Sequence, residues 1–444
     1  MRCVRAEKAL RSVPKGGFLI QKTLRKHFVL YTFEPMVIGT LREVKDNENR
    51  VGLTPKGVAD LVNAGYTVIV ERQAGWGSGF PDHLYEEAGG KLLDSAYEIV
   101  KRADLIIKIK EPVEAEYYWL DLFKGKTLFT YLHLSGVDPK LTEKLLENDI
   151  TAIAYETVLK DGRLPLLAPM SQVAGVLACQ YGAHYLQKKH GGVGVTLGHI
   201  DGAESALTVV VGAGFVGTTA ALTAGGMGGR VAVLDINQKA LDRSKEALSE
   251  RLGTKLMKNV TVQLSTPKIL AEWIAKADLL IGAVLIPGAK APQVVSEEMI
   301  GSMKRGAVVV DVAIDQGGCI WGSKPTTHRH PIYDLNGKIF CCITNMPGQV
   351  AHQSTQALTS ATLPYILEMG EYGIIEALKK NEGLRAGLNV FRGKITYESV
   401  AKDLKLEHLY VPAEKLLETE PGERSHNGLA KTISKSTEKP AMRE

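Results

Sequence analysis

Five polar residues stand after apolar, strand-like runs, and their side chains could together bind and react with a small anion. Arg50 lies in NENRVGLTP, Lys110 in IIKIKEP, His133 in TYLHLSG, Asp315 in DVAIDQGG and Asn345 in ITNMPG. A guanidinium can hold a carboxylate through two parallel hydrogen bonds, and an ammonium can neutralise it. Imidazole exchanges protons near neutral pH. These residue types therefore indicate acid–base chemistry on a small anionic substrate.

A glycine-rich turn in the middle of the chain predicts a dinucleotide site. The apolar run 207–211 leads into Gly212, Gly214 and Gly217, an alanine-rich helical stretch follows, and a second apolar run ends on Asp235. This order matches a G-x-G-x-x-G turn between strand and helix, with an acidic residue about 20 positions further on. The glycines allow a tight turn and a close approach to a pyrophosphate. Asp235 would accept hydrogen bonds from ribose hydroxyls and repel a 2′-phosphate, which favours NAD over NADP.

Apolar runs alternate with helical patterns along most of the chain, which indicates α/β architecture with parallel sheets covered on both faces. We expect two open doubly wound, Rossmann-like domains with a cleft between them, joined by two long helices near residues 172–189 and 355–372. Expected strands are 37–41, 67–71, 105–110, 127–134, 150–155, 207–211, 231–234, 279–285, 307–311 and 338–343. Open sheets of this kind bind ligands beyond the carboxyl ends of their strands, where the five polar residues lie.

The expected domains follow from this alternation. They are a substrate or catalytic domain (36–166), a dinucleotide-binding domain (167–350), a return to the catalytic domain (351–410) and a polar tail (411–444). Residues 1–35 are rich in Arg and Lys and differ from the rest. They have the composition of a transit peptide, or else translation starts at Met36, directly before the first strand-like run; we favour the second interpretation.

Composition excludes several classes of protein. The chain of 444 residues is 45% hydrophobic and 23% charged, with a net charge of +5, and no apolar run approaches the roughly 20 residues of a membrane helix. We therefore expect no nucleic-acid or membrane partner. The cysteines suit neither a zinc site nor a disulfide framework, which favours a reducing cytoplasm. They are Cys3, Cys179, Cys319, Cys341 and Cys342.

From about Met36 to about Leu406 the chain resembles NAD-dependent alanine dehydrogenases, in the family that also holds the transhydrogenase alpha subunit. The matching segments include NENRVGLTP, KIKEP, FTYLHL, AYETV, LPLLAPMSQVAG, VLDIN, IGAVLIPGAKAP, VDVAIDQGG and GSKPTT. The resemblance implies reversible oxidation of L-alanine to pyruvate and ammonia with NAD as cofactor. It also implies a homo-oligomer, typically a hexamer.

The resemblance also implies roles for individual residues. Arg50 and Lys110 match the substrate-binding pair, and His133 and Asp315 match the catalytic pair. Lys108 is a competing candidate, because period-2 spacing would place it on the same strand face as Lys110. A structural role at a strand end is expected for the neighbouring residue Asp311.

Further cofactor contacts follow from the resemblance, in addition to the three glycines and Asp235. They are Ser171, Phe215, Val216, Ser265, Val284, Leu285, Val312, Ala313, Ile314, Ile343, Thr344, Asn345 and Met346. The segments 312–315 and 343–346 would lie at the nicotinamide, although both could be loop structure only.

The sequence departs from the family pattern in three places. Lys239 is displaced by one position from the family's lysine after the ribose aspartate, and the turn 349–353 lacks the expected basic residue. Some members have a metal-binding glutamate and histidine. Glu156 matches the glutamate, but Tyr372 replaces the histidine, so we predict no bound metal.

Three other functions stay open. A transhydrogenase-like hydride carrier would need neither a carboxylate clamp nor an imidazole acid–base, and the combination of Arg50, Lys110, His133 and Asp315 argues against it. The same four residues argue against a non-catalytic NAD-binding protein. An amino-acid dehydrogenase for a larger substrate would have the same residues, so alanine rests on the resemblance alone.

Overall fold

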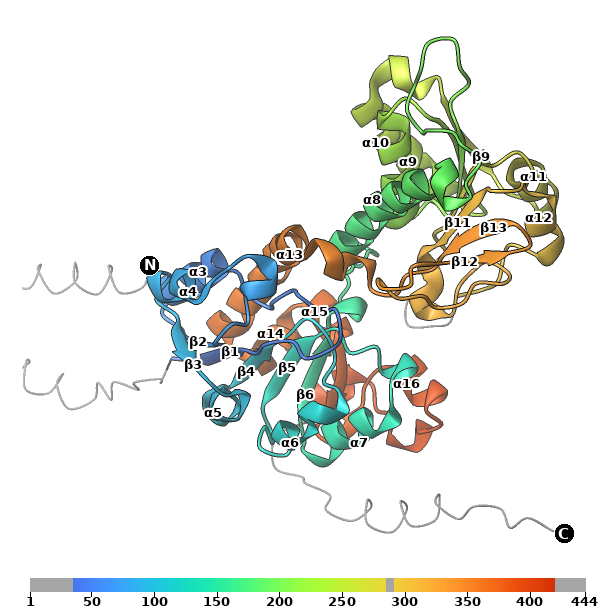
Figure 1. Cartoon of the computed structure of the whole chain (residues 1–444). Coiled ribbons are helices and arrows are strands. Elements are labelled where there is room, and N and C mark those ends of the chain that lie inside the picture. The colour runs from blue at the N-terminus through green and yellow to red at the C-terminus, as the bar shows by residue number, and fades with distance from the viewer. Residues whose placement is uncertain (1–34, 285–290, 420–444) are drawn as a thin grey trace, which may run out of the picture. The chain divides into compact units, whose positions relative to one another are not determined.

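The computed structural model describes residues 35–284 and 291–419, whose strands form two sheets (Figure 1). The first sheet runs, in spatial order, β15 (Lys394–Ile395), β14 (Leu388–Phe391), β6 (Thr151–Ala154), β5 (Thr127–Thr130), β4 (Leu105–Ile107), β1 (Val37–Thr40), β2 (Thr67–Glu71) and β3 (Lys91–Leu93). The second runs β12 (Ile332–Leu335), β13 (Lys338–Cys341), β11 (Val308–Asp311), β10 (Leu279–Gly282), β7 (Leu207–Val211), β8 (Arg230–Asp235) and β9 (Val260–Leu264).

The strand order confirms the doubly wound fold. In each sheet the first strand along the chain, β1 or β7, lies in the middle, and later strands are added first on one side and then on the other. In the first sheet, the neighbouring strands β6, β5, β4, β1, β2 and β3 all pair in parallel. In the second sheet, β13, β11, β10, β7, β8 and β9 do the same. The order reverses between β1 and β4 and between β7 and β10. Ligand sites form at such reversals, beyond the carboxyl ends of the strands.

Neither sheet is purely parallel, which corrects the expectation from the sequence. β12 pairs with β13, β14 with β15, and β14 with β6 in antiparallel fashion. Two-residue turns join the two hairpins, Asn336-Gly337 and Arg392-Gly393, and all four residues have positive φ. Such turns match the twist of antiparallel strands and favour Asn-Gly pairs, so they add antiparallel strands to the edges of both sheets.

Helices cover both sheets. Thr54, Asp138 and Thr266 each cap a helix that begins with proline, by accepting a first-turn N–H on the side-chain oxygen. The α-helices are α3 (Pro55–Asn63), α4 (Asp82–Glu87), α5 (Ala96–Arg102), α6 (Tyr117–Leu120), α7 (Pro139–Glu147), α8 (Ala168–Tyr185), α9 (Phe215–Gly226), α10 (Gln238–Met257), α11 (Pro267–Ile274), α12 (Glu297–Ser302), α13 (Ala351–Tyr372), α14 (Ile374–Lys380), α15 (Glu382–Ala386), α16 (Glu398–Asp403) and α17 (Ala413–Glu418). None of the described helices is both long and apolar enough to cross a membrane.

Each sheet carries a hydrophobic core on both faces. In β4, Leu105 and Ile107 belong to one core and Ile106 to the opposite one, as alternation along a strand requires. The long helix α8 contributes Met170 to a core of the first sheet and Leu177 to a core of the second. Helices α8 and α13 also pack against each other, so both long helices lie where the chain passes from one sheet to the other.

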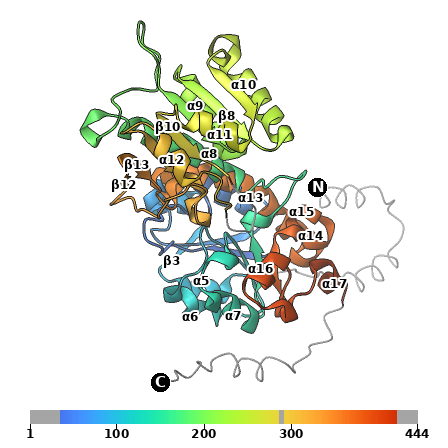
Figure 2. The ribbon, with the colours of Figure 1, turned by 90° about the vertical axis from the view of Figure 1, so that its right-hand side faces the viewer.

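Several sequence-based boundaries are wrong. The strand predicted over 105–110 ends at Ile107, and the one predicted over 127–134 ends at Thr130. The pattern also predicts a polar tail from residue 411, but Ala413 and Leu417 of α17 are buried against the first sheet's core, one helical turn apart. Figure 2 shows α14, α15, α16 and α17 together in orange and red. The predictions for residues 1–34 and 420–444, and for the cofactor residue Leu285, concern residues outside the described ones.

Candidate active site

The glycine turn after β7 forms a cradle that only glycine permits at two positions. Gly212 has φ 109°, and a Cβ added there would lie 2.5 Å from the carbonyl oxygen of Ala283. A Cβ on Gly217 would lie 1.8 Å from the carbonyl oxygen of Gly212. Gly214 caps α9 and has open space around its Cβ position. The first N–H groups of α9, beginning at Phe215, have no helical carbonyl before them to accept, so this cradle fits a pyrophosphate.

Asp235 lies beside this cradle at the end of β8. Its carboxylate accepts the N–H of Ala213 at 2.7 Å and that of Asn237 at 2.8 Å. The N–H of Ser265 in turn donates to the Asp235 carbonyl oxygen. A carboxylate has about four acceptor positions, so Asp235 can still accept ribose hydroxyls. Val216, in the first turn of α9, completes the set of predicted residues around this turn.

The other predicted cofactor residues follow β10, β11 and β13, or begin α8. Val284 follows β10, and Ser171 is in the first turn of α8. The side chains of Ala313, Ile314, Ile343 and Met346 are buried in the cores, so only their backbone could face a ligand. Partly exposed side chains in these segments belong to Val312, Thr344 and Asn345.

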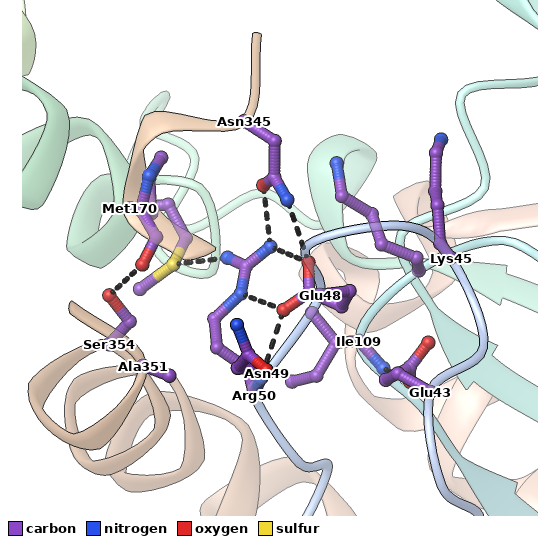
Figure 3. Close-up of polar contacts among 12 residues, drawn as sticks. Glu43, Lys45, Glu48, Asn49, Arg50, Ile109, Met170, Asn345, Ala351 and Ser354 are labelled. Atoms are coloured by element: carbon purple, nitrogen blue, oxygen red, sulfur yellow. Dashed lines mark hydrogen bonds and ion pairs between the residues drawn. The ribbon is translucent and has the colours of Figure 1, made fainter. Parts of the chain in front are cut away.

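Arg50 is almost fully buried, and each of its three guanidinium nitrogens has a polar contact (Figure 3). Its Nε donates to Glu48 at 2.6 Å, and one terminal nitrogen donates to both Glu48 and Asn345. The other terminal nitrogen lies 2.9 Å from the sulfur of Met170. Asn345 also donates to Glu48 at 3.0 Å. The guanidinium is therefore fixed along one edge by Glu48, while its opposite edge faces a weak sulfur acceptor and a neutral amide.

The charged side chains around Arg50 shift one another's pKa values. Burial alone would raise the pKa of Glu48, but Arg50, Lys110 and Asn345 together outweigh it and lower that pKa to about 2, with Arg50 contributing most. Burial and the nearby Arg50 lower the pKa of Lys110, against the opposing charge of Asp315. Glu111 is buried, yet Lys110, Lys45 and His133 lower its pKa. Lys110 therefore lies within electrostatic reach of Arg50 and Asp315, and Glu111 within reach of Lys110 and His133.

Lys108 occupies a different environment from Lys110. Its ammonium is fully buried and donates to Glu43 at 3.0 Å and to Glu116 at 2.8 Å. These two carboxylates outweigh burial and raise the pKa of Lys108. One ammonium does not neutralise two carboxylates, and burial raises the pKa of Glu43 to about 7. Lys108 is thus committed to a buried ion cluster, whereas Lys110 is partly exposed at the strand end.

His133 lies three residues beyond β5, and 38% of its side chain is exposed. Its backbone is left-handed, with φ 48° and ψ 35°. The Tyr131 ring stacks on the imidazole with a 2° angle between planes and 5.6 Å between centroids. The Glu156 carboxylate accepts the His133 N–H at 2.6 Å. A half-exposed imidazole with a fixed ring plane can exchange protons with a small bound molecule.

Asp315 is exposed in the short helical turn after β11, and its carboxylate accepts the N–H of Asn345 at 3.3 Å. The neighbouring Asp311 is fully buried and accepts from three backbone N–H groups and from the hydroxyl of Ser323. The structural role expected for Asp311 is confirmed, because its carboxylate closes the loop from 313 to 323.

Two family models cover nearly all of the described chain. The alanine dehydrogenase/PNT N-terminal domain matches residues 39–174, and the C-terminal domain of the same name matches residues 178–398. The chain belongs to the alanine dehydrogenase/PNT family.

Relatives of known name agree with this membership. An alanine dehydrogenase of Methanococcus maripaludis is 50% identical over 385 residues, which span 86% of this chain and 100% of that protein. An alanine dehydrogenase of Bacillus subtilis is 46% identical over 87% of this chain and 98% of that protein. A solved structure named L-alanine dehydrogenase is 42% identical, with a TM-score of 0.76 over 83% of this chain and 99% of that one. As in the whole alanine dehydrogenase/PNT family, the cofactor class is a nicotinamide dinucleotide.

Glu156 is the residue that the sequence resemblance relates to a metal ligand. Within residues 35–284 and 291–419, no group of three or more His, Cys, Asp or Glu side chains is placed to hold an ion. The Glu156 carboxylate instead accepts backbone N–H groups of Leu132 and His133. The absence of a bound metal stays a prediction for this alanine dehydrogenase/PNT member.

Sequence reasoning missed three residues that shape the site: Glu48, Met170 and Glu156, the last of which it considered only as a metal ligand. Glu48 stands two positions before Arg50, and a carboxylate so close to a buried arginine is a usable signal of pairing. Met170 and Glu156 are distant in sequence from the residues they contact, Arg50 and His133. Nothing local in the sequence marks those two contacts.

Proposed function

We propose that this chain is an NAD-dependent L-alanine dehydrogenase. It converts L-alanine, water and NAD⁺ to pyruvate, ammonium, NADH and a proton, and catalyses the reverse amination. The observation that carries the proposal is the gathering of four groups at the carboxyl ends of the strands. Arg50 donates to the side chain of Asn345, whose backbone N–H donates to Asp315. In keeping with this, the charges of Arg50 and Asp315 both affect the pKa of Lys110, and those of Lys110 and His133 both lower the pKa of Glu111.

The substrate carboxylate would bind along the edge of Arg50 that faces Met170 and Asn345. A carboxylate is a stronger acceptor than a thioether or a neutral amide, so it would replace both contacts in a bidentate arrangement. Glu48 would hold the guanidinium in place during this exchange. Burial is the largest cause of the lowered pKa of Lys110, followed by the charge of Arg50, and an anionic substrate bound beside both groups would stabilise their charged forms.

His133 and Asp315 would handle the protons. Bound NAD supplies the hydride acceptor for C2 of alanine. His133 would accept a proton as water attacks the resulting imine, and would return it in the amination direction. Asp315, exposed and within reach of Lys110, would lie near the substrate ammonium and the departing ammonia. The carboxylate of Asp235 supports NAD over NADP, since it would repel a 2′-phosphate.

The test is NADH formation, followed by absorbance, with NAD and L-alanine at mildly alkaline pH. NADP, D-alanine, L-serine and larger amino acids serve as comparisons, and the His133→Ala variant tests the proton-transfer role. We expect NADH with L-alanine and a loss of about 10²- to 10⁴-fold in the variant. Normal NAD binding without reduction by any amino acid would contradict the proposal and favour a hydride carrier.

By family resemblance we also propose a homohexamer. Light scattering of the purified protein would measure its mass directly, and a monomer would contradict this part of the proposal.

A further inference from the structure

His133 is held in a backbone conformation that side-chain-bearing residues rarely adopt. Its φ of 48° and ψ of 35° fall in the left-handed region, where Cβ crowds the following carbonyl group. The residue is not part of a regular strand, because β5 ends at Thr130. Such a conformation persists only where the surroundings impose it, and it decides where the imidazole points.

One carboxylate contacts this part of the backbone. Glu156 follows β6, the strand that pairs with β5, and is 8% exposed. Its Oε1 accepts the N–H of His133 at 2.6 Å and that of Leu132 at 3.2 Å, and its Oε2 also accepts the Leu132 N–H at 3.2 Å. Within the described residues, these two N–H groups have no other hydrogen-bond acceptor.

The hydrogen bonds of Glu156 go to the backbone and not to the ring. The Nδ1 atom of His133 lies 3.8 Å from Oε1 of Glu156, which is too far for a hydrogen bond but close enough for an ion pair when the imidazole is protonated. The ring plane is set separately by the stacked Tyr131, whose hydroxyl donates to the carbonyl oxygen of Leu166 at 2.6 Å. Glu156 thus fixes where the ring is attached, and Tyr131 fixes how its plane is turned.

We propose that Glu156 is a positioning residue that acts through His133, by holding residues 132 and 133 in the one backbone conformation that aims the imidazole at the substrate. The inference rests on the proposed function and extends it. It assigns the Glu156 carboxylate to alignment of the acid–base group, through hydrogen bonds to two backbone N–H groups.

Three substitutions in the full-length protein separate this role from others. In Glu156→Gln, the amide oxygen can take the place of Oε1, which accepts both N–H groups, so the contact survives without the charge. In Glu156→Asp, the charge survives, but the shorter side chain does not reach. Glu156→Ala removes both. A displacement of about 1 Å at a reacting group can cost about 10²-fold in rate.

We therefore expect Glu156→Ala and Glu156→Asp to lower kcat by roughly 10- to 100-fold, with KM for L-alanine and Kd for NAD changed by less than about threefold. Glu156→Gln should recover most of the kcat. The charge-retaining variant would thus be worse than the neutral one, an order that a purely electrostatic role does not produce. Circular dichroism and Tm report whether each variant folds, and the aspartate variant provides the test if the alanine variant does not fold.

A double-mutant cycle tests whether Glu156 acts through His133. In a His133→Ala background, Glu156→Asp should change the residual rate by less than about twofold. The inference would be overturned if Glu156→Asp lowered the rate by the same factor with His133 present and with His133 replaced by alanine. A wild-type kcat in the folded Glu156→Asp variant would also overturn it. If the wild-type protein itself forms no NADH from L-alanine, the proposed function fails instead, and the two failures are distinguishable.

Discussion

The pair formed by Glu48 and Arg50 yields a quantitative prediction for Glu48→Gln. Both side chains are buried, with 0% and 2% of their surface exposed, and the substitution replaces the anionic partner by a neutral amide of the same shape. Lowering the pKa of Glu48 from its ordinary value of 4.5 to about 2 corresponds to about 3 kcal/mol of stability at pH 7. Removal of one partner of a buried ion pair typically costs about 3–5 kcal/mol, which agrees.

The sign of the pH dependence follows from the lowered pKa. The contribution of Glu48 is present above its unfolded-state pKa and is lost as the pH falls through about 2. The difference in unfolding free energy between wild type and Glu48→Gln should therefore shrink from about 3 kcal/mol at pH 7 to about 1.4 kcal/mol at pH 3. Urea unfolding followed by tryptophan fluorescence at both pH values measures it.

A matched control is Asp60→Asn, which removes an exposed ion pair with Lys56 and should leave stability near that of the wild type. The reasoning would be refuted if Glu48→Gln stayed within about 1 kcal/mol of the wild type at pH 7. A difference that is the same at pH 7 and pH 3 would also refute it, because the effect would then not come from an ionised carboxylate.

Two further predictions concern the glycine turn and the two lysines after β4. Gly212→Ala should destabilise the fold by about 1–3 kcal/mol, because φ is 109° and Cβ would meet the Ala283 carbonyl, whereas Gly214→Ala should keep the wild-type Tm and weaken NAD binding in calorimetry. Equal loss of stability in both variants would contradict this division. Lys108→Met leaves two buried carboxylates without a cation and should lower the unfolding free energy by about 3–5 kcal/mol. Lys110→Met should fold normally and lose L-alanine-dependent NADH formation; the reverse pattern would assign substrate binding to Lys108.

Ten strands, the two long helices and the chemical groups of the candidate site could be predicted from the sequence, because these features depend on local chemistry. The remaining described strands, β3, β9, β12, β14 and β15, were not predicted. Apolar runs mark the strands, and the glycine turn depends on a positive φ at Gly212, which glycine adopts freely. The carboxyl ends of parallel strands share one edge, so residues that follow successive strands gather without knowledge of any contact. The predicted strand bounds were wrong where a strand ends early, as β4 does at Ile107. Lys108 and Lys110 then no longer share a strand face.

Only the tertiary structure decided what each site residue contacts. Arg50 meets Asn345, 295 positions away, and Glu156 meets the backbone of His133 across two neighbouring strands. Such contacts depend on which strands are adjacent and on where each chain leaves the sheet, and neither is written in local periodicity. The sequence by itself therefore determined which chemical groups are present and at which edge of each sheet they lie. The packing of distant segments decided which of those groups are paired, buried or held in a strained conformation.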